Sequence, residues 1–211
     1  MKKLFYLIIS FFIFLVIIFK ISPKESIGII DGALSQSCIS ENKIEEYISL
    51  GNENIKNTHG ETVLKKIRNN INNDVYYVNV EESDNGGINI DKVTKALEIL
   101  RNKKVKIINL SLAFNYEDKK LEIEIKKCIE DGIVIVASVD NSDIESYPAC
   151  YDKVIAVAKE GSTIEKKELV KLNEESCNSY RTAKVTNYIV KNKLCNENID
   201  KIIKKLNEKY N

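Results

Sequence analysis

Short apolar runs alternate with amphipathic segments along most of the chain. Five of these runs have the length and the Val and Ile content of buried parallel strands. They cover residues 27–30, 75–80, 105–110, 133–139 and 154–158. Residues 160–176 are polar, and the pattern there predicts one hairpin strand near Leu169.

Apolar residues recur at helical spacing between several of these runs. Thr58 is the predicted N-cap of a helix whose first turn contains His59 and Gly60, and Asp91 is the predicted N-cap of the next helix. The remaining predicted helices cover residues 117–131, 179–191 and 199–206.

Two stretches show no sustained period. We expect residues 33–57 to form a long loop that contains one helix, at 43–50. Residues 81–89 include two adjacent glycines and are expected to form a turn-rich loop.

Strands and helices that alternate at this spacing are typical of βαβ units. They predict an α/β fold with a doubly wound, mostly parallel sheet and helices on both of its faces. Such sheets bind ligands at the carboxyl ends of their strands. Asp31, Ser111 and Asn141 lie at or just past the end of a predicted strand, and His59 and Ser179 begin helices. We expect these five residues to meet at one edge of the sheet.

Residues 1–24 form a separate segment that predicts one N-terminal hydrophobic helix. Two lysines precede residues 4–19, in which only a tyrosine and a serine carry a polar side-chain atom. This apolar stretch is slightly shorter than the roughly 20 residues of a spanning helix. It is also slightly longer than the core of a signal peptide, which has about 7–15 residues.

No small-residue cleavage site follows the apolar stretch, because bulky and charged residues occupy positions 18–21. We therefore expect an uncleaved, single-pass membrane anchor at 1–24 and a compact domain at 25–211 outside the cell membrane. Lysines on both flanks give only a mild preference for this orientation. The alternative is a cleaved signal and a secreted protein.

The charge balance and the cysteines argue against nucleic-acid binding and against a zinc site. The 32 Lys and Arg residues nearly equal the 31 Asp and Glu residues, so no long-range field favours nucleic acid. The five cysteines include no Cys-x-x-Cys pair and have no histidine nearby, which argues against a zinc site. Their pairing cannot be deduced from the sequence, and an odd number leaves at least one free thiol.

Ser179 is the candidate nucleophile. At the start of a helix its hydroxyl lies near the positive end of the helix dipole, although most serines at such positions are ordinary N-caps. A serine nucleophile needs a base, and the base needs an acidic partner that fixes its tautomer. His59 is the only histidine, so it must be the base if this chemistry operates. In isolation, an exposed histidine at a helix start usually has no catalytic role.

Six segments resemble the motifs of the subtilisin-like serine proteases, the subtilases, in the order found in that family. They are residues 29–32 (Ile-Ile-Asp-Gly), 59–63 (His-Gly-Glu-Thr-Val), 107–113 (Ile-Ile-Asn-Leu-Ser-Leu-Ala), 132–141 (from Gly-Ile-Val-Ile-Val-Ala to Asn), 147–157 (Tyr-Pro-Ala to Val-Ile-Ala-Val) and 178–185 (Asn-Ser-Tyr-Arg-Thr-Ala-Lys-Val). Together they span about residues 27–190.

The resemblance implies a subtilisin-like fold and an Asp-His-Ser triad. In this sequence the triad would be Asp31, His59 and Ser179, and Asn141 would supply the side-chain donor of the oxyanion hole. The backbone at Ser111, Leu112 and Ala113 would bind the substrate as an added strand. Calcium is common in the family, but we find no carboxylate cluster to assign to it and expect no other cofactor.

The chain departs from the family pattern at several points. Cys177 and Ala183 replace a glycine and a proline that flank the nucleophile in the family, and Asp140 stands where a glycine usually precedes the oxyanion asparagine. The interval between Asn141 and Ser179 is much shorter than in the typical enzyme. We therefore expect strands of the specificity pocket to be missing, which leaves the substrate preference open.

Three functions compete. The first is a membrane-tethered serine endopeptidase, expected to be a monomer, that hydrolyses peptide or protein substrates. The second is a catalytically impaired relative that binds peptides by strand addition. The presence of Asp, His, Ser and Asn at all four matching positions favours the enzyme. The third, an unrelated Rossmann-like enzyme that acts on small molecules, lacks the Gly-x-Gly-x-x-Gly fingerprint.

Overall fold

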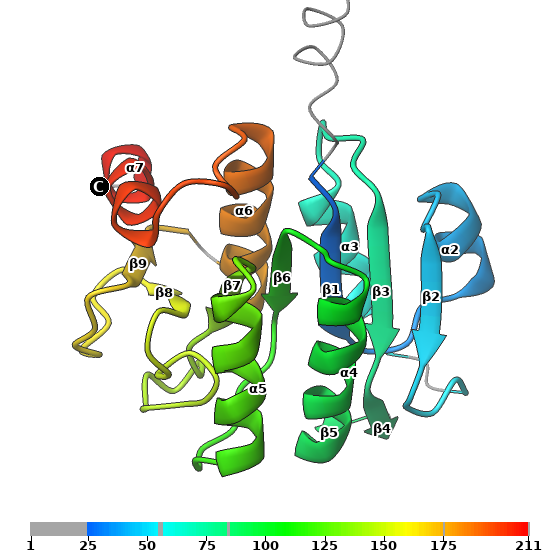
Figure 1. The fold of residues 1–211 in the computed structure, drawn as a ribbon. Coiled ribbons are helices and arrows are strands. Elements are labelled where there is room, and N and C mark those ends of the chain that lie inside the picture. The colour runs from blue at the N-terminus through cyan, green and yellow to red at the C-terminus, as the bar shows by residue number, and fades with distance from the viewer. Residues whose placement is uncertain (1–24, 55–56, 84, 175, 211) are drawn as a thin grey trace, which may run out of the picture.

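The computed structural model describes residues 25–54, 57–83, 85–174 and 176–210. Within these ranges, seven strands form one sheet in the order β2-β3-β1-β6-β7-β8-β9, and every neighbouring pair is parallel (Figure 1). The strands are β1 (Ile27–Asp31), β2 (Glu46–Ser49), β3 (Val75–Asn79), β6 (Ile107–Leu110), β7 (Val134–Ser138), β8 (Ile155–Lys159) and β9 (Leu169–Leu172). The predicted parallel α/β sheet is therefore confirmed.

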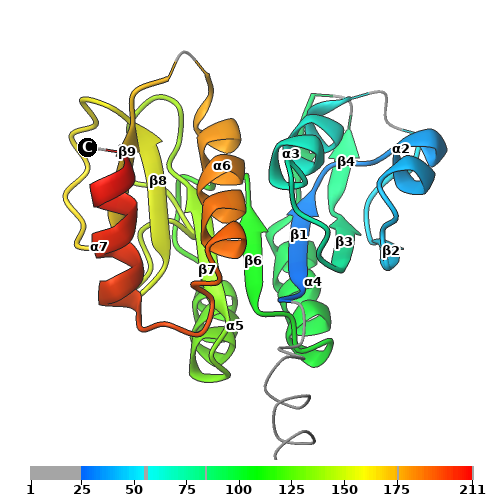
Figure 2. The same cartoon turned by 90° about the horizontal axis from the view of Figure 1, so that it is seen from above.

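Helices cover both faces of the sheet (Figure 2). One face carries α2 (Gln36–Glu41), α3 (His59–Ile67), α6 (Asn178–Lys191) and α7 (Ile199–Tyr210), and the other carries α4 (Ile90–Asn102) and α5 (Lys119–Glu130). Each face has its own apolar core, and alternate strand residues belong to each, with Ile29 in one and Ile30 in the other. Strands that are buried on both faces must be apolar throughout, which explains the continuous runs in the sequence.

The loop predicted at 33–57 is wrong in both of its parts. Its first half contains the short helix α2, which Ser35 caps by accepting a hydrogen bond from the backbone N–H of Cys38. The helix predicted at 43–50 is instead the edge strand β2, which pairs only with β3. Cys38 is the one buried residue of α2, and all four residues of β2 are half-buried, so neither element leaves a clear period in the sequence.

Smaller differences occur elsewhere in the chain. The strand expected near Leu169 is not part of a hairpin, because β9 pairs in parallel with β8 and extends the main sheet. The turn-rich loop at 81–89 contains a two-stranded hairpin formed by β4 (Glu81–Ser83) and β5 (Gly87–Ile88). Asn89, not Asp91, caps α4, since its side chain accepts a hydrogen bond from the backbone N–H of Asp91.

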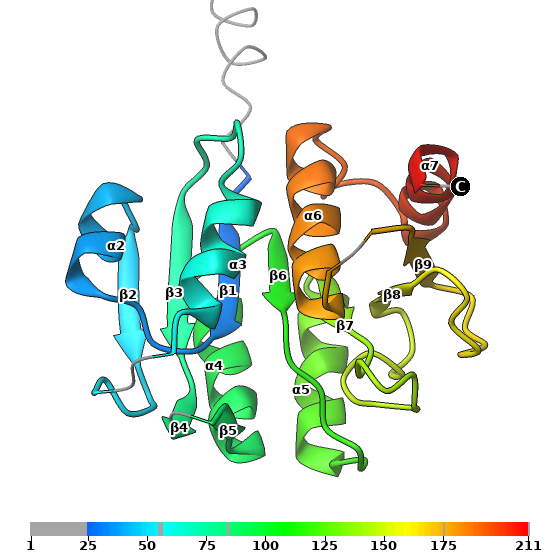
Figure 3. The same cartoon turned by 180° about the vertical axis from the view of Figure 1, so that it is seen from behind.

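The sheet brings the segments of interest to one edge. Because β1 lies between β3 and β6, its last residue, Asp31, lies opposite Asn79 and close to the end of β6. Helices α3 and α6 pack side by side over the same face, as Figure 3 shows from behind. Their first residues therefore lie near the carboxyl ends of β1, β6 and β7.

The hydrophobic helix predicted at 1–24 lies outside the described residues. Of the helices within the described ranges, none combines the length and the apolar character needed to cross a bilayer.

Candidate active site

Asp31 and His59 form the centre of the site. Asp31 is the last residue of β1 and is only 4% exposed, and its Oδ1 lies 2.8 Å from Nδ1 of His59. The same oxygen accepts a hydrogen bond of 2.7 Å from the backbone N–H of Gly32. Because Oδ1 accepts, Nδ1 of a neutral His59 carries the proton and Nε2 is left as the basic atom.

The first turn of α3 fixes the backbone of His59. The side-chain oxygen of Asn57 accepts a hydrogen bond of 2.9 Å from the His59 N–H. Gly60, which follows, packs so closely that a Cβ there would lie 2.8 Å from the carbonyl oxygen of Gly32 and 2.2 Å from the hydroxyl of Tyr77. That hydroxyl donates to the Gly32 carbonyl at 2.7 Å. A glycine after the histidine is therefore needed for α3 to approach β1.

The surroundings of His59 raise its pKa above the ordinary histidine value. The hydrogen bond to Asp31 is the largest cause, and the negative charges of Asp31 and Glu81 act in the same direction. Partial burial opposes them, because desolvation disfavours the imidazolium. An imidazole of raised pKa is a stronger base, which suits it to accept a proton from a hydroxyl.

Ser179 lies in the first turn of α6 and is buried, with 8% of its surface exposed. Its hydroxyl donates to the backbone carbonyl of Ser111 at 3.0 Å, and the Ser111 hydroxyl donates to the Ser179 carbonyl at 3.0 Å. No hydrogen bond joins the Ser179 hydroxyl to the ring of His59 in this arrangement, although both residues are described. The structure thus brings Asp31 and His59 together directly and ties Ser179 to the end of β6.

Tyr180 connects α6, which carries Ser179, to His59. Its ring stacks on that of His59, with centroids 5.7 Å apart and an angle of 22° between the planes. The ammonium group of Lys66, from α3, lies 5.2 Å from the centroid of the Tyr180 ring. Because Tyr180 directly follows Ser179, this stack places His59 beside the turn that carries the serine.

Buried polar side chains behind Ser179 hold α6 against β6. Ser111 Oγ accepts a hydrogen bond of 2.9 Å from the amide of Asn109, and Asn109 Oδ1 accepts one of 2.9 Å from the hydroxyl of Thr186. Asn109 and Thr186 have no exposed surface. A fully bonded buried network of this kind fixes one register between a strand and a helix.

Two asparagines organise the N-terminus of α6. Asn141, which is exposed, accepts a hydrogen bond of 2.8 Å at Oδ1 from the backbone N–H of Asn178. Asn178 is buried and donates to the carbonyls of Val139 and Asp140, at 3.0 and 3.2 Å. The amide nitrogen of Asn141 and the backbone N–H of Ser179 make no hydrogen bond to another described residue. Because Asn141 contacts the first N–H of α6 and Ser179 lies in its first turn, both donors lie at the positive end of the helix dipole.

The comparisons with known proteins identify the family. A family model described as Peptidase S8, the subtilase family, matches residues 48–195, which is more than half of the chain. The chain belongs to the subtilase family. The matched segment contains His59, Asn141 and Ser179, and Asp31 precedes it.

Two solved structures have the same fold as this subtilase. The prenylagaramide maturation protease PagA superposes with a TM-score of 0.64 at 19% identity, over 80% of this chain and 74% of that chain. The protease domain of PatA, solved as a serine-to-alanine mutant, gives a TM-score of 0.63 at 17% identity, over 78% of this chain and 77% of that chain. No curated protein matches the chain by sequence.

The segment after β6 is open at its backbone. Leu112 is buried and Ala113 half-buried, and the backbone groups of these two residues make no hydrogen bond to another part of the described chain. Phe114 then pairs with Tyr147 through two backbone hydrogen bonds of 2.7 and 2.8 Å. Unpaired backbone groups beside Ser179 are what strand addition by a peptide requires.

The short connection between β9 and α6 is held by Arg181. Its guanidinium donates to the backbone carbonyls of Leu172, Glu174 and Ser176 and, at 3.0 Å, to Oδ1 of Asn178. Desolvation is the main cause that lowers the pKa of this buried side chain. Arg181 thereby fixes the backbone that leads into α6, in a subtilase whose sequence between Asn141 and Ser179 is short.

The sequence did not reveal four residues of the site. Asn57, Asn178 and Tyr180 are sequence neighbours of the predicted residues, so their positions could have suggested a supporting role. Glu81 gave no signal, because it follows β3 within a polar stretch. It is nevertheless 2% exposed, and its Oε1 accepts a hydrogen bond of 2.7 Å from Asn57.

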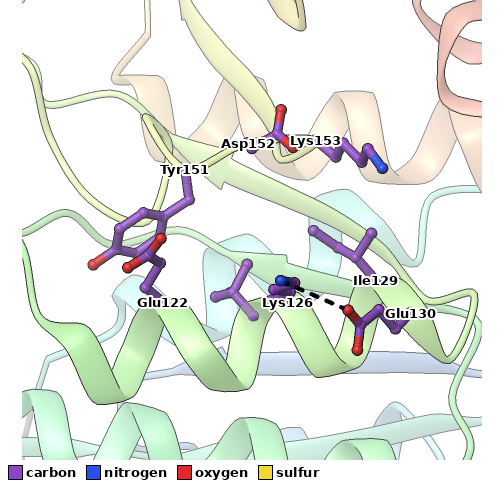
Figure 4. Close-up of a pocket in the computed structure, with 8 residues that line it drawn as sticks. Glu122, Lys126, Ile129, Glu130, Tyr151, Asp152 and Lys153 are labelled. Atoms are coloured by element: carbon purple, nitrogen blue, oxygen red, sulfur yellow. Dashed lines mark ion pairs between the residues drawn. The ribbon is translucent and has the colours of Figure 1, made fainter.

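A separate pocket of about 250 Å³ lies along α5. Figure 4 shows that it is lined by Glu122, Lys126, Ile129, Glu130, Tyr151, Asp152 and Lys153. None of the predicted site residues lines it, and two of its charged side chains, Lys126 and Glu130, form an ion pair at 4.0 Å. We assign it no part in the activity.

The described residues form neither a disulfide nor a cluster of metal-ligating side chains. All five cysteines are free thiols, including Cys177 at the start of α6. Among the described residues, no cluster of three or more His, Cys, Asp or Glu side chains could hold a metal ion. The calcium that the resemblance allows therefore has no ligand set here to which we assign it.

Proposed function

We propose that this subtilase is a serine endopeptidase in which Asp31, His59 and Ser179 form the triad. The observation that carries the proposal is the hydrogen bond of 2.8 Å between Asp31 and His59, made beside the first turn of α6, which carries Ser179. A buried carboxylate that fixes the tautomer of a histidine leaves its other nitrogen available as a base.

In the first step, the Ser179 hydroxyl leaves the Ser111 carbonyl and donates to Nε2 of His59. Its oxygen then attacks the carbonyl carbon of the scissile peptide bond, and its proton passes to Nε2. The carbonyl oxygen gains the negative charge, which the amide nitrogen of Asn141 and the Ser179 N–H stabilise. The imidazolium, oriented by Asp31, donates its proton to the leaving amine, and water later releases the acyl group by the same route.

The substrate is a peptide that adds as a strand along Leu112 and Ala113. Their backbone groups have no partner in the described chain and lie just past Ser111, whose carbonyl contacts Ser179. The pairing between Phe114 and Tyr147 closes the segment at its far end. Main-chain pairing gives affinity with little sequence preference, so adjacent side chains must supply the specificity.

A second function, peptide binding without hydrolysis, is favoured by one observation. The Ser179 hydroxyl donates to a backbone carbonyl and not to His59. If this arrangement persisted with a peptide bound, the serine would remain unactivated. The two functions therefore differ in the reactivity of Ser179.

The proposal can be tested with a fluorophosphonate, which reacts at a useful rate only with an activated serine. The full-length protein is expected to bind one label per chain, at Ser179. Labelling should disappear in Ser179→Ala and fall at least about 100-fold in His59→Ala. Ser142→Ala is the matched control, because Ser142 is exposed on the loop next to Asn141.

Two outcomes of the labelling experiment would contradict the proposal. A folded wild-type protein that binds a peptide but takes up no label would favour the non-catalytic function. Label at another serine would refute the assignment of Ser179.

The proposal also covers the location of the protein in the cell, which depends on residues 1–24. We propose that this segment tethers the protease domain to the cell membrane, with the domain on the outer side. A cleaved signal and a secreted domain are the alternative. The apolar stretch at 4–19 and the absence of a small-residue cleavage site support the tether.

A further inference from the structure

A second buried carboxylate lies beside the Asp31–His59 pair. Glu81, the first residue of β4, is 2% exposed, and its Oε1 accepts a hydrogen bond of 2.7 Å from the side-chain amide of Asn57. The oxygen of the same amide accepts a hydrogen bond of 2.9 Å from the backbone N–H of His59. Asn57 therefore links the Glu81 carboxylate to the residue that carries the ring.

The other oxygen of Glu81 faces the end of β1. Oε2 is buried and has no hydrogen-bond partner among the described residues, and a Cβ built on Gly32 would lie 2.2 Å from it. The N–H of the same Gly32 donates to Asp31 Oδ1. Among the described residues, no lysine or arginine forms an ion pair with Glu81, although 15 such pairs exist elsewhere. Within the part of the chain that the structure describes, a negative charge at this position is therefore not offset by an ion pair.

The groups around His59 come from five elements. Asp31 comes from β1 and Glu81 from β4, the Tyr77 hydroxyl of β3 lies on the Gly32 carbonyl, and Tyr180 of α6 stacks on the ring. From α3 itself, the ammonium group of Lys66 lies over the Tyr180 ring. The two carboxylates are the charged groups whose influence raises the pKa of His59.

We propose that Glu81 is a positioning residue for His59, which it orients through Asn57 and whose imidazolium it stabilises with its charge. The inference rests on the proposed function, in which His59 receives the proton of Ser179. The ring gains a positive charge in that step, and a second buried carboxylate lowers the energy of the charged state.

The test uses Glu81→Gln, which keeps an oxygen to accept from Asn57 and removes the charge. Because His59 is the only histidine, its ring protons can be followed by NMR during a pH titration of the full chain, purified in detergent without a histidine tag. We expect the ratio of protonated to neutral His59 at a given pH to fall about three- to tenfold in the variant.

The same change should alter the reaction of Ser179. A base must be neutral to act, so the variant is expected to keep its fluorophosphonate labelling to lower pH than the wild type. Well below the wild-type midpoint, it should label about three- to tenfold faster relative to its own plateau. Glu81→Leu also removes the acceptor of Asn57, so it should in addition lower the plateau, by loosening His59.

Glu25→Gln is the matched control. Glu25 is also buried with an unpartnered Oε2, but it precedes β1 and lies at the opposite end of that strand from Asp31. Its variant should leave both the NMR titration and the pH profile of labelling unchanged.

Two outcomes overturn the inference. One is an unchanged His59 titration in Glu81→Gln, and the other is an equal shift in Glu25→Gln, which would reflect net charge alone. A shifted titration specific to Glu81→Gln, in a protein whose Ser179 takes up no label, would support the link between Glu81 and His59. In that case the proposed hydrolysis would be wrong, and the inference about Glu81 would stand.

Discussion

At the scale of single residues, the side chain of Asn141 combines an observed contact with a proposed catalytic role, and the two can be separated. Its oxygen accepts the backbone N–H of Asn178 and so caps α6, while its nitrogen makes no hydrogen bond to a described residue. A cap contributes about 1 kcal/mol of stability, and an oxyanion donor contributes about 100- to 1000-fold in rate. A substitution that removes the whole side chain would combine the two effects.

Asn141→Asp separates them. The carboxylate can still accept from Asn178 at the positive end of the helix, so we expect the midpoint of urea unfolding to stay the same or to rise slightly. The donor is replaced by a negative charge, and turnover of a peptide library, followed by mass spectrometry, should fall at least about 100-fold.

Asn141→Ala should lose activity to a similar degree and also about 0.5–2 kcal/mol of stability. Full turnover by Asn141→Asp would exclude Asn141 from the oxyanion hole.

At the scale of elements, the sequence predicted the strands that are buried on both faces of the sheet. It did not predict the edge strand β2, whose extended form depends on pairing with a neighbour. The buried strands β1, β3, β6, β7 and β8 were predicted within about two residues, because strands covered on both faces must be apolar. The edge strand β2 was predicted as part of a helix, since only its pairing with β3 makes it extended. Edge strands depend on a neighbour that a single sequence does not display.

The same distinction applies to the site. Asp31 follows an apolar strand, and His59 and Ser179 begin helices, so their meeting at one edge of the sheet could be predicted from topology. Glu81 could not, because its burial depends on the backbone of Gly32 and on the side chain of Asn57. The bond from Ser179 to the Ser111 carbonyl also could not, since it depends on how α6 sits on β6.

The packing of α3 on β1 gives a prediction about Gly60. A methyl group in Gly60→Ala would displace the Tyr77 hydroxyl and press on the Gly32 carbonyl, so the first turn of α3 must move away from β1. We expect a loss of about 1–3 kcal/mol in urea unfolding. Because His59 belongs to that turn, labelling at Ser179 should slow by about tenfold or more.

Two further variants test the cause. Thr58→Ala changes the exposed neighbouring residue, whose side chain makes no capping hydrogen bond, and should behave like the wild type. Adding Tyr77→Phe to Gly60→Ala removes the nearer contact and should restore part of the stability. Wild-type stability and labelling in Gly60→Ala would show that α3 does not need this close approach.

At the scale of the whole molecule, the chain enters the sheet and performs its proposed chemistry at opposite ends of β1. Glu25 and Ile27 lie at the amino end, next to Asn73, and Asp31 ends the strand at the edge that carries the candidate site. Five residues of strand separate the two ends by about 16 Å. A tether formed by residues 1–24 would therefore join the domain at the end opposite the edge that carries the candidate site. That edge would then face away from the membrane.

This arrangement predicts that membrane attachment and activity are independent. We expect the full-length protein to remain in the membrane fraction after a carbonate wash, with the amino-terminal sequence of the mature protein beginning at or near Met1. Ser179 in the membrane-bound protein should label at the same rate as in detergent, because an edge that faces away from the bilayer stays open to soluble reagents. A mature protein that begins near residue 22 would exclude the anchor and indicate secretion, and slower labelling in membranes would show that the catalytic edge faces the bilayer.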